Sequence, residues 1–253
     1  MYFDTHTHLD DERFQEDRDT VVQKMRDARV SLAVNIGADM ESSRKSIEIA
    51  KTYDGIYAAV GVHPHAAEEM SDEDIATLAQ MSKEPKVVAI GEIGLDYYYD
   101  NSPRELQKQW FRRQIELAKE LDLPYVVHDR DAHADCMQII KDSGYFRGVM
   151  HCYSGSPEMA QELLKLGFYI SFAGPVTFKN GKKAKEAANM IPMDRLLIET
   201  DSPYLTPEPH RGKRNDSSYV PFIAKEIAAI KGLTVEETAR LTCENGKRFF
   251  GIK

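Results

Sequence analysis

The sequence begins with YFDTHTH at residues 2–8, an apolar start that runs directly into two histidines two positions apart. Residues i and i+2 of a strand point to the same face, so His6 and His8 can present both imidazoles to one centre. A doubly wound open sheet normally carries a glycine-rich phosphate turn directly after its first strand. Because residues 5–8 read THTH instead, the start of the chain favours a parallel barrel over an open sheet.

Eight short apolar runs recur along the chain, separated by longer segments with a helical pattern of apolar residues. Short runs rich in Val, Ile and aromatic residues are typical of buried parallel strands. Eight alternations of strand and helix predict an α/β fold, a TIM-type (β/α)₈ barrel, which commonly uses about 250 residues. The predicted strands are residues 2–5, 32–36, 56–60, 87–90, 125–127, 148–150, 168–172 and 196–198.

Several boundaries of helices and loops can also be predicted. The segment SPRE at residues 102–105 has the spacing of a capping box with proline at the first helical position, and SP at 156–157 opens another helix. Residues 203–219, rich in proline and charge, predict a long loop on the active face, and residues 233–253 predict extra C-terminal helices. No low-complexity stretch, linker or repeat interrupts the pattern, so we expect a single domain over residues 1–253.

The composition is that of an ordinary globular protein, with 42% hydrophobic and 29% charged residues. The first residues lack the charged and apolar regions of a signal peptide, and no apolar run approaches about 18 residues. We therefore expect neither a signal peptide nor a membrane segment. Three scattered cysteines, Cys136, Cys152 and Cys243, predict reduced thiols and a cytoplasmic location. The net charge of −8 does not favour long-range attraction of a DNA duplex, so a nucleic-acid substrate would have to be held locally.

Residues that bind metals or move protons follow six of the eight predicted strands, where each apolar run ends. Barrel enzymes place their catalytic groups at the carboxyl ends of the strands, so these side chains are expected to meet. Burying several neutral imidazoles and carboxylates together is costly unless a cation compensates. We therefore predict a metal centre with the ligands His6, His8, Glu92, His128, His151 and Asp201.

The predicted ligands divide between two ions. His6, His8 and Asp201 come from the first and last strands, which are neighbours in a closed barrel, and are assigned to one ion. His128 and His151 follow adjacent strands and are assigned to the other. Glu92 is the candidate bridge, and two ions about 3.5–4 Å apart can activate a water while Asp201 accepts its proton. Mixed nitrogen and oxygen ligands suit Zn²⁺, Mn²⁺, Co²⁺ or Ni²⁺, and Mg²⁺ less well.

Five motifs along the chain together resemble those of the TatD-type deoxyribonucleases. They are DTHTHL at 4–9, GVHPH at 61–65, GEIGLDY at 91–97, HCYSG at 151–155 and ETDSPYLTP at 199–207. The match continues to ENGKRF at 244–249, so it covers nearly the whole chain. The resemblance implies an amidohydrolase-like metal barrel, the ligands assigned above, and a divalent-metal-dependent nuclease acting on DNA ends. Tyr153 stands where Phe is commoner in that family, and Glu92 replaces the carboxylated lysine of many amidohydrolases.

Other residues are candidates for contact with the substrate. His63 ends the third predicted strand and can reach a phosphate oxygen or the leaving group, so it joins Glu92 and Asp201 as a candidate catalytic residue. The basic cluster at residues 211–214 can bind phosphate or form a solvated loop. The three tyrosines Tyr97, Tyr98 and Tyr99 can stack on a base or pack their loop. The predicted substrate-binding residues are His63, His65, Arg130, Lys179, Arg211 and Tyr97.

Three functions fit these predictions. The first is a deoxyribonuclease of the 3′–5′ exonuclease type, which hydrolyses phosphodiester bonds of single-stranded DNA with a water activated by two metals. The alternative is an amidohydrolase-type enzyme acting on a small amide, lactone or phosphoester, because the fold and the metals do not select the substrate. The third is a non-catalytic metal-bound adaptor. It ranks last because all six ligands are present. DNA or an oligonucleotide is the expected partner, and no obligate protein partner is evident.

Overall fold

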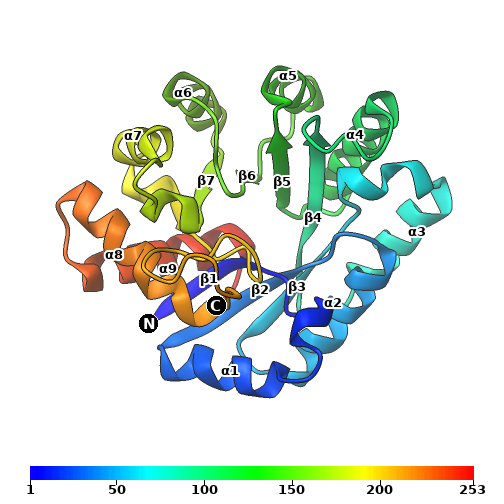
Figure 1. Ribbon diagram of the computed structural model, residues 1–253. Helices are drawn as coiled ribbons and strands as arrows, with labels where there is room; N and C mark the ends of the chain where they lie inside the picture. The colour runs from blue at the N-terminus through cyan, green and yellow to red at the C-terminus, as the bar shows by residue number, and fades with distance from the viewer. The chain divides into compact units, whose positions relative to one another are not determined.

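Eight strands alternate with nine α-helices along the chain in the computed structural model, which describes residues 1–253 (Figure 1). Each apolar run that predicted a strand forms one. The strands are β1 Tyr2–Thr7, β2 Val30–Ile36, β3 Ile56–Val60, β4 Val87–Asp96, β5 Tyr125–Arg130, β6 Gly148–Met150, β7 Tyr169–Phe172 and β8 Leu196–Ile198. The α-helices are α1 Arg18–Asp27, α2 Met40–Thr52, α3 Asp72–Met81, α4 Arg104–Glu120, α5 His133–Ser143, α6 Pro157–Leu166, α7 Lys182–Met190, α8 Val220–Lys231 and α9 Val235–Phe250.

Three strands continue beyond the apolar runs that predicted them. β1 continues to Thr7, β4 to Asp96 and β5 to Arg130. The polar ends keep their backbone pairing, since Gly94 of β4 is in parallel register with His128 of β5. Candidate ligands in these extensions therefore rest on strand backbone, which positions a side chain more precisely than a loop does.

The chain forms two compact units, here called unit 1 and unit 2. Unit 1 comprises Met1–Asn35 and Cys152–Lys253, and unit 2 comprises Ile36–His151. The expectation of a single domain over residues 1–253 stays a prediction. No helix of the chain combines the length and the apolar character that crossing a membrane requires.

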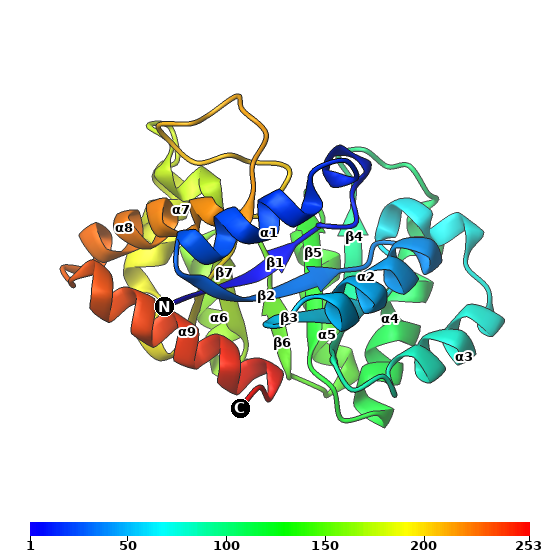
Figure 2. The same ribbon diagram turned by 90° about the horizontal axis from the view of Figure 1, so that it is seen from below.

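Unit 1 is built on strands from both ends of the sequence. β1 pairs in parallel with β2, and β7 with β8, while a bridge between Thr7 and Ser202 joins the segment after β8 to β1. Figure 2 shows α9 beside β1, where the ring centroids of Phe3 and Phe250 lie 6.0 Å apart. The first strand and the last helix therefore share one apolar core.

Unit 2 contains β3, β4, β5 and β6, paired in parallel in that order, with α4 and α5 packed against β4 and β5 (Figure 1). Two buried glutamines of α4 bond to the backbone at strand ends. Gln114 accepts a hydrogen bond from Val62 N at 2.8 Å and donates one to Val62 O at 3.0 Å. Gln107 accepts one from Asp96 N at 2.9 Å. α4 thus fixes the backbone next to the candidate site residues of unit 2.

The predicted helix and loop boundaries have mixed outcomes. Ser156 caps α6 as predicted, accepting a hydrogen bond from Met159 N. The capping box predicted at residues 102–105 is wrong, because the N-cap of α4 is Pro103 and Ser102 instead donates to His65 O at 2.9 Å. A tertiary partner has therefore displaced the local cap. The C-terminal segment forms one helix, α9. The loop predicted over residues 203–219 holds for residues 203–216, but its last three residues form a short 3-10 helix, Ser217–Tyr219.

We expect the substitution Gly246→Ala in α9 to destabilise the protein, although alanine is ordinarily the better helix former. A Cβ at Gly246 would lie 2.6 Å from Cδ1 of the buried Phe3. Such overpacking costs about 1–3 kcal/mol, which offsets or exceeds the gain of about 1 kcal/mol in helix propensity. Urea unfolding measures the difference. In a Phe3→Leu background, which makes room at this contact, the same substitution should cost less; an equal cost would contradict the packing explanation.

Candidate metal centre

Unit 1 brings three of the predicted ligands together. His6 Nε2 lies 3.1 Å from His8 Nε2, and Asp201 Oδ1 lies 3.5 Å from each of these nitrogens. The backbone explains the arrangement, because Asp201 N donates to His6 O at 2.9 Å and His8 N donates to Ser202 O at 2.8 Å. Asp201 has φ 55, a left-handed conformation that Asp tolerates better than most residues. We call His6, His8 and Asp201 the unit 1 triad.

Unit 2 brings together the other three predicted ligands. Glu92 Oε1 lies 2.8 Å from His128 Nδ1 and 2.8 Å from His151 Nε2, and the two nitrogens lie 3.3 Å apart. Glu92 is held by strand backbone, since its N donates to Gly37 O at 2.8 Å. We call Glu92, His128 and His151 the unit 2 triad.

Both triads have the spacing of donor atoms around a divalent cation. Ligand bonds of about 2.0–2.2 Å place neighbouring donors about 2.8–3.6 Å apart in octahedral or tetrahedral shells. The distances within the two triads run from 2.8 to 3.5 Å. Imidazole and carboxylate donors also match the preferences of first-row divalent metals. The residues present therefore fit the metal ions that the sequence predicts.

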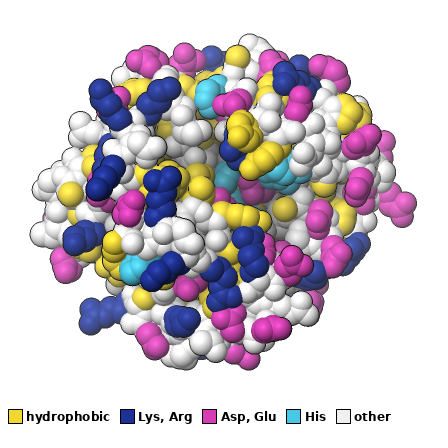
Figure 3. Space-filling model, viewed as in Figure 1, with side chains coloured by type: hydrophobic (Ala, Val, Ile, Leu, Met, Phe, Trp, Pro, Cys, Tyr) yellow, Lys and Arg dark blue, Asp and Glu magenta, His cyan; other side chains and the backbone are white.

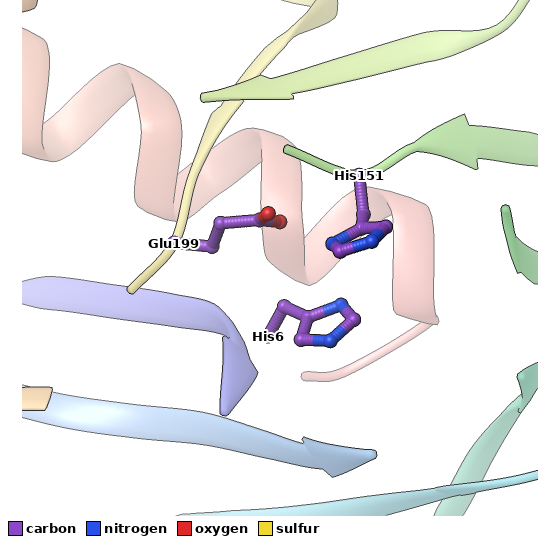
Figure 4. A group of neighbouring side chains, drawn as sticks. All are labelled: His6, His151 and Glu199. Atoms are coloured by element: carbon purple, nitrogen blue, oxygen red, sulfur yellow. The ribbon is translucent and has the colours of Figure 1, made fainter. Parts of the chain in front are cut away.

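Glu199 is a further candidate ligand that the sequence prediction did not include. It follows β8, and its carboxylate lies within 4.8 Å of the His6 imidazole. In Figure 4 the Glu199 side chain extends from the end of β8 toward the space beside the His6 ring. The third labelled residue, His151, is the last residue of unit 2. Glu199 Oε1 accepts a hydrogen bond from Cys152 N at 2.7 Å, which fixes its orientation. The sequence ETD at 199–201 contains two carboxylates directly after β8, of which the predicted ligands include only Asp201.

Asp4 precedes the unit 1 triad in β1 and is completely buried. Its carboxylate accepts hydrogen bonds from Thr200 N at 2.9 Å and Thr200 Oγ1 at 2.6 Å, and a longer one from His6 N at 3.3 Å. Asp4 therefore ties the backbone of β1 to the segment that follows β8. Burial raises the pKa of Asp4 to about 7, against the opposing effect of these hydrogen bonds.

Asp96 orients the unit 2 triad from behind. Its Oδ2 lies 3.1 Å from His128 Nε2 and 2.8 Å from His65 Nε2. Burial raises the pKa of Asp96, but hydrogen bonds from His128, the Tyr99 backbone and His65 outweigh it, so the pKa lies well below its usual range. A carboxylate that accepts from the outer nitrogen of a histidine fixes the ring and makes the inner nitrogen a better ligand.

His63 lies beside the unit 2 triad. Its Nε2 is 3.7 Å from Glu92 Oε1, and its ring contacts those of His65 and His128 with centroids 4.2 and 4.3 Å away. Burial holds the pKa of His63 well below the usual value, so the ring is neutral. His63 Nδ1 accepts a hydrogen bond from His65 N at 3.1 Å, so the proton of the neutral ring is on Nε2. His63 is thus a hydrogen-bond donor toward the side of Glu92.

The predicted substrate-binding residues are divided between unit 1 and unit 2 and differ in exposure. In unit 1, Lys179 and Arg211 are exposed, and Arg211 lies over the Phe178 ring at 4.3 Å. Figure 3 shows Lys and Arg side chains gathered on the face of unit 1 over α7. In unit 2, Arg130 lies over two exposed tyrosine rings, whereas Tyr97 is partly buried and its hydroxyl donates to Asp135 at 2.6 Å.

Parallel strands that alternate with helices and carry such groups of imidazoles and carboxylates define the class of metal-dependent hydrolases with an α/β fold. A family model described as TatD related DNase matches residues 3–251. The chain belongs to the TatD family.

Relatives with curated names agree with this assignment. "Uncharacterized metal-dependent hydrolase YabD" of Bacillus subtilis is 50% identical over 254 residues, covering 100% of each chain. "3'-5' ssDNA/RNA exonuclease TatD" of Erwinia tasmaniensis is 34% identical over 258 residues, covering 99% of this chain and 100% of the relative. The protein is therefore a metal-dependent hydrolase of this family.

A solved structure confirms the fold. The crystal structure of the TatD homologue YJJV from Escherichia coli matches with a TM-score of 0.94 at 29% identity, covering 100% of this chain and 98% of that one. The (β/α)₈ barrel predicted from the alternating apolar runs is the fold of the chain.

We expect the replacement of Asp4 by Asn to change how stability depends on pH. Asp4 has a pKa of about 7 in the folded protein and about 3.9 when unfolded. Between these values the folded protein holds a proton that the unfolded chain has released, so stability falls as pH rises. In Asp4→Asn this contribution is absent. The difference in free energy of unfolding, variant minus wild type, should therefore increase with pH by up to about 1.4 kcal/mol per pH unit. Urea unfolding of the chelated proteins at pH 5, 6 and 7 measures it; parallel profiles would contradict the burial effect.

We expect Asp96→Asn to weaken metal binding about 10- to 100-fold, the usual effect of losing a carboxylate behind a ligating histidine. Asparagine keeps an oxygen for the backbone N–H groups of Tyr98 and Tyr99 but cannot offer a charged acceptor to His128 as well. Titration with Zn²⁺ or Mn²⁺ against a competing chelator measures the affinity. Asp135→Asn is the matched control, because its carboxylate bonds to Tyr97 and Lys108, not to a histidine. Equal affinities in both variants would show that Asp96 does not orient His128.

Proposed function

We propose that this hydrolase cleaves phosphodiester bonds of single-stranded DNA from the 3′ end, and that each of the two triads binds one divalent cation. The spacing of donor atoms within each triad carries the proposal, since each triad offers one divalent cation three ligands. Glu92 would hold a divalent cation together with His128 and His151. The name of the Erwinia relative, an exonuclease acting on single-stranded nucleic acid, supports the choice of substrate and polarity.

The chemistry of the proposed centre divides between the metals and the protein. Bound divalent cations would lower the pKa of a water and neutralise charge on the phosphoryl oxygens. Asp201 is assigned as the base that accepts the proton of the attacking water, because its Oδ1 faces the metal-binding nitrogens of His6 and His8. His63, with its proton on Nε2, is assigned to donate a hydrogen bond to an oxygen of the scissile phosphate or the leaving group.

Phosphate binding outside the centre is assigned to basic residues of both units. Arg211 and Lys179 lie in exposed segments of unit 1, which Thr177 Oγ1 connects by accepting a hydrogen bond from Glu208 N at 2.9 Å. Arg130 supplies a guanidinium in unit 2. Such local positive groups are what an enzyme with a net charge of −8 needs to bind a polyanion.

The decisive experiment is hydrolysis of single-stranded oligonucleotides labelled at the 3′ or the 5′ end, with and without chelator. We expect stepwise loss of nucleotides from the 3′ end by the metal-loaded enzyme and none after chelation. Glu92→Gln and Asp201→Asn should lower the rate about 10²- to 10⁴-fold, as expected for loss of acid–base and ligand groups.

His133→Gln is the matched control, since this first residue of α5 bonds to Asp129 of β5 and belongs to neither triad. It should cleave like wild type. Metal analysis should find two divalent ions per chain. Chelator-resistant cleavage, or full activity of Glu92→Gln, would overturn the proposal. Hydrolysis of lactones or amides with the oligonucleotides left intact would assign the centre to a small-molecule substrate instead.

A further inference from the structure

Exposed large apolar side chains are confined to two places besides the N-terminal Met1. They are Tyr98 and Tyr99, which follow β4, and Tyr204 and Leu205, which follow β8. In Figure 3, hydrophobic side chains, a class that includes Tyr, are visible over the ends of β4 and β5. Adjacent exposed aromatic residues at the carboxyl end of a barrel strand mark a binding surface more often than a packing accident.

Tyr98 and Tyr99 are exposed but held in place. Their backbone N–H groups both donate to Asp96 Oδ1, at 3.0 and 2.9 Å. The Arg130 guanidinium lies over both rings, 4.1 Å from the Tyr98 centroid and 4.7 Å from that of Tyr99. The Tyr99 ring also meets the edge of His65, with centroids 5.4 Å apart. We call Tyr98, Tyr99 and Arg130 the aromatic platform.

The platform leaves a large aromatic area accessible. Tyr98 and Tyr99 remain 59% and 55% exposed although Arg130 covers part of each ring. Tyr97 is used differently, because its hydroxyl bonds to Asp135 and the Arg104 guanidinium lies over its ring at 4.2 Å. Of the three successive tyrosines, therefore, the second and third present aromatic surface to solvent and the first packs against unit 2.

We propose that the aromatic platform binds one nucleobase of the substrate by stacking, a role that rests on the proposed nuclease function. A nucleotide matches both features of the platform, since its base has a flat π face for the tyrosine rings and its phosphate is an anion for Arg130. Guanidinium groups also stack on bases, so Arg130 can contact base or phosphate without leaving the rings.

The same carboxylate connects the platform to the unit 2 triad. Asp96 Oδ1 holds the backbone of Tyr98 and Tyr99, and Oδ2 faces His128. The position of the tyrosines is therefore fixed relative to a metal ligand, which is what a site that positions a substrate requires. The platform acts by binding and orienting the substrate and takes no part in proton transfer.

The experiment compares two oligonucleotides that differ only in whether the residues near the 3′ end carry bases or are abasic. Wild-type enzyme should prefer the base-bearing oligonucleotide about tenfold in kcat/KM, the usual scale for stacking on an aromatic side chain. The Tyr98→Leu/Tyr99→Leu variant keeps apolar bulk but removes the rings, so its preference should fall to within about twofold of unity. The Tyr98→Phe/Tyr99→Phe variant keeps the rings and should retain the preference. The ratio within each variant cancels any general loss of active protein.

A second readout does not depend on hydrolysis. A phosphorothioate-linked oligonucleotide carrying 2-aminopurine, whose fluorescence is quenched by stacking, is titrated with metal-loaded protein. Quenching should be present with wild type and the Phe variant and absent with the Leu variant.

The combined outcomes separate the two proposals. Cleavage with an unchanged base preference in the Leu variant would overturn the proposed base stacking on the platform but would agree with the nuclease function. Tyrosine-dependent quenching by a protein that cleaves no oligonucleotide would overturn the proposed function and keep the platform. If the Leu variant still quenches the fluorescence, the proposed base stacking on the platform is overturned as well.

Discussion

The close approach of imidazole and carboxylate donors within each triad is the constraint on which the site depends. Donor atoms that lie 2.8 to 3.5 Å apart exclude water from one another and compete for the same protons. The backbone holds them there: Asp201 N bonds to His6 O in unit 1, and Glu92 N bonds to Gly37 O in unit 2. These backbone hydrogen bonds thus hold the donor atoms of each triad close together.

The strands and the ligand types could be predicted from the sequence because both depend on residues that follow one another along the chain. A buried parallel strand needs a short apolar run, and its carboxyl end is the next residue along the chain, so the placement of His6, Glu92 and His128 follows from counting. The extension of β4 to Asp96 could not be predicted in this way. It depends on pairing with β5 and on Gln107 of α4, which are partners distant in sequence.

Residues that act through another side chain escaped the sequence prediction for the same reason. Asp96 belongs to a recognised motif, yet its role behind His128 depends on where its two oxygens point. Glu199 is absent from the predicted ligands, although its carboxylate also lies near His6. Among three identical tyrosines the spacing gave no basis for choosing, and Tyr97 is distinguished only by the position of Asp135. Tertiary hydrogen bonds, not residue types, decide these roles.

The exposed aromatic residues that follow β4 and those that follow β8 lose conformational freedom by the same physical means. In unit 2, Arg130 lies over two tyrosine rings, and in unit 1, Arg13 lies 4.3 Å from the centroid of Tyr204 while its guanidinium bonds to Asp11. A guanidinium stacked on a ring restricts the ring without burying it, because the cation itself remains hydrated at its edge. Burial would fix the rings more strongly but would remove the surface that a ligand needs. Stacked arginines therefore permit an aromatic surface that is ordered and accessible at once, and in unit 2 the backbone bonds to Asp96 add the fixed distance from His128.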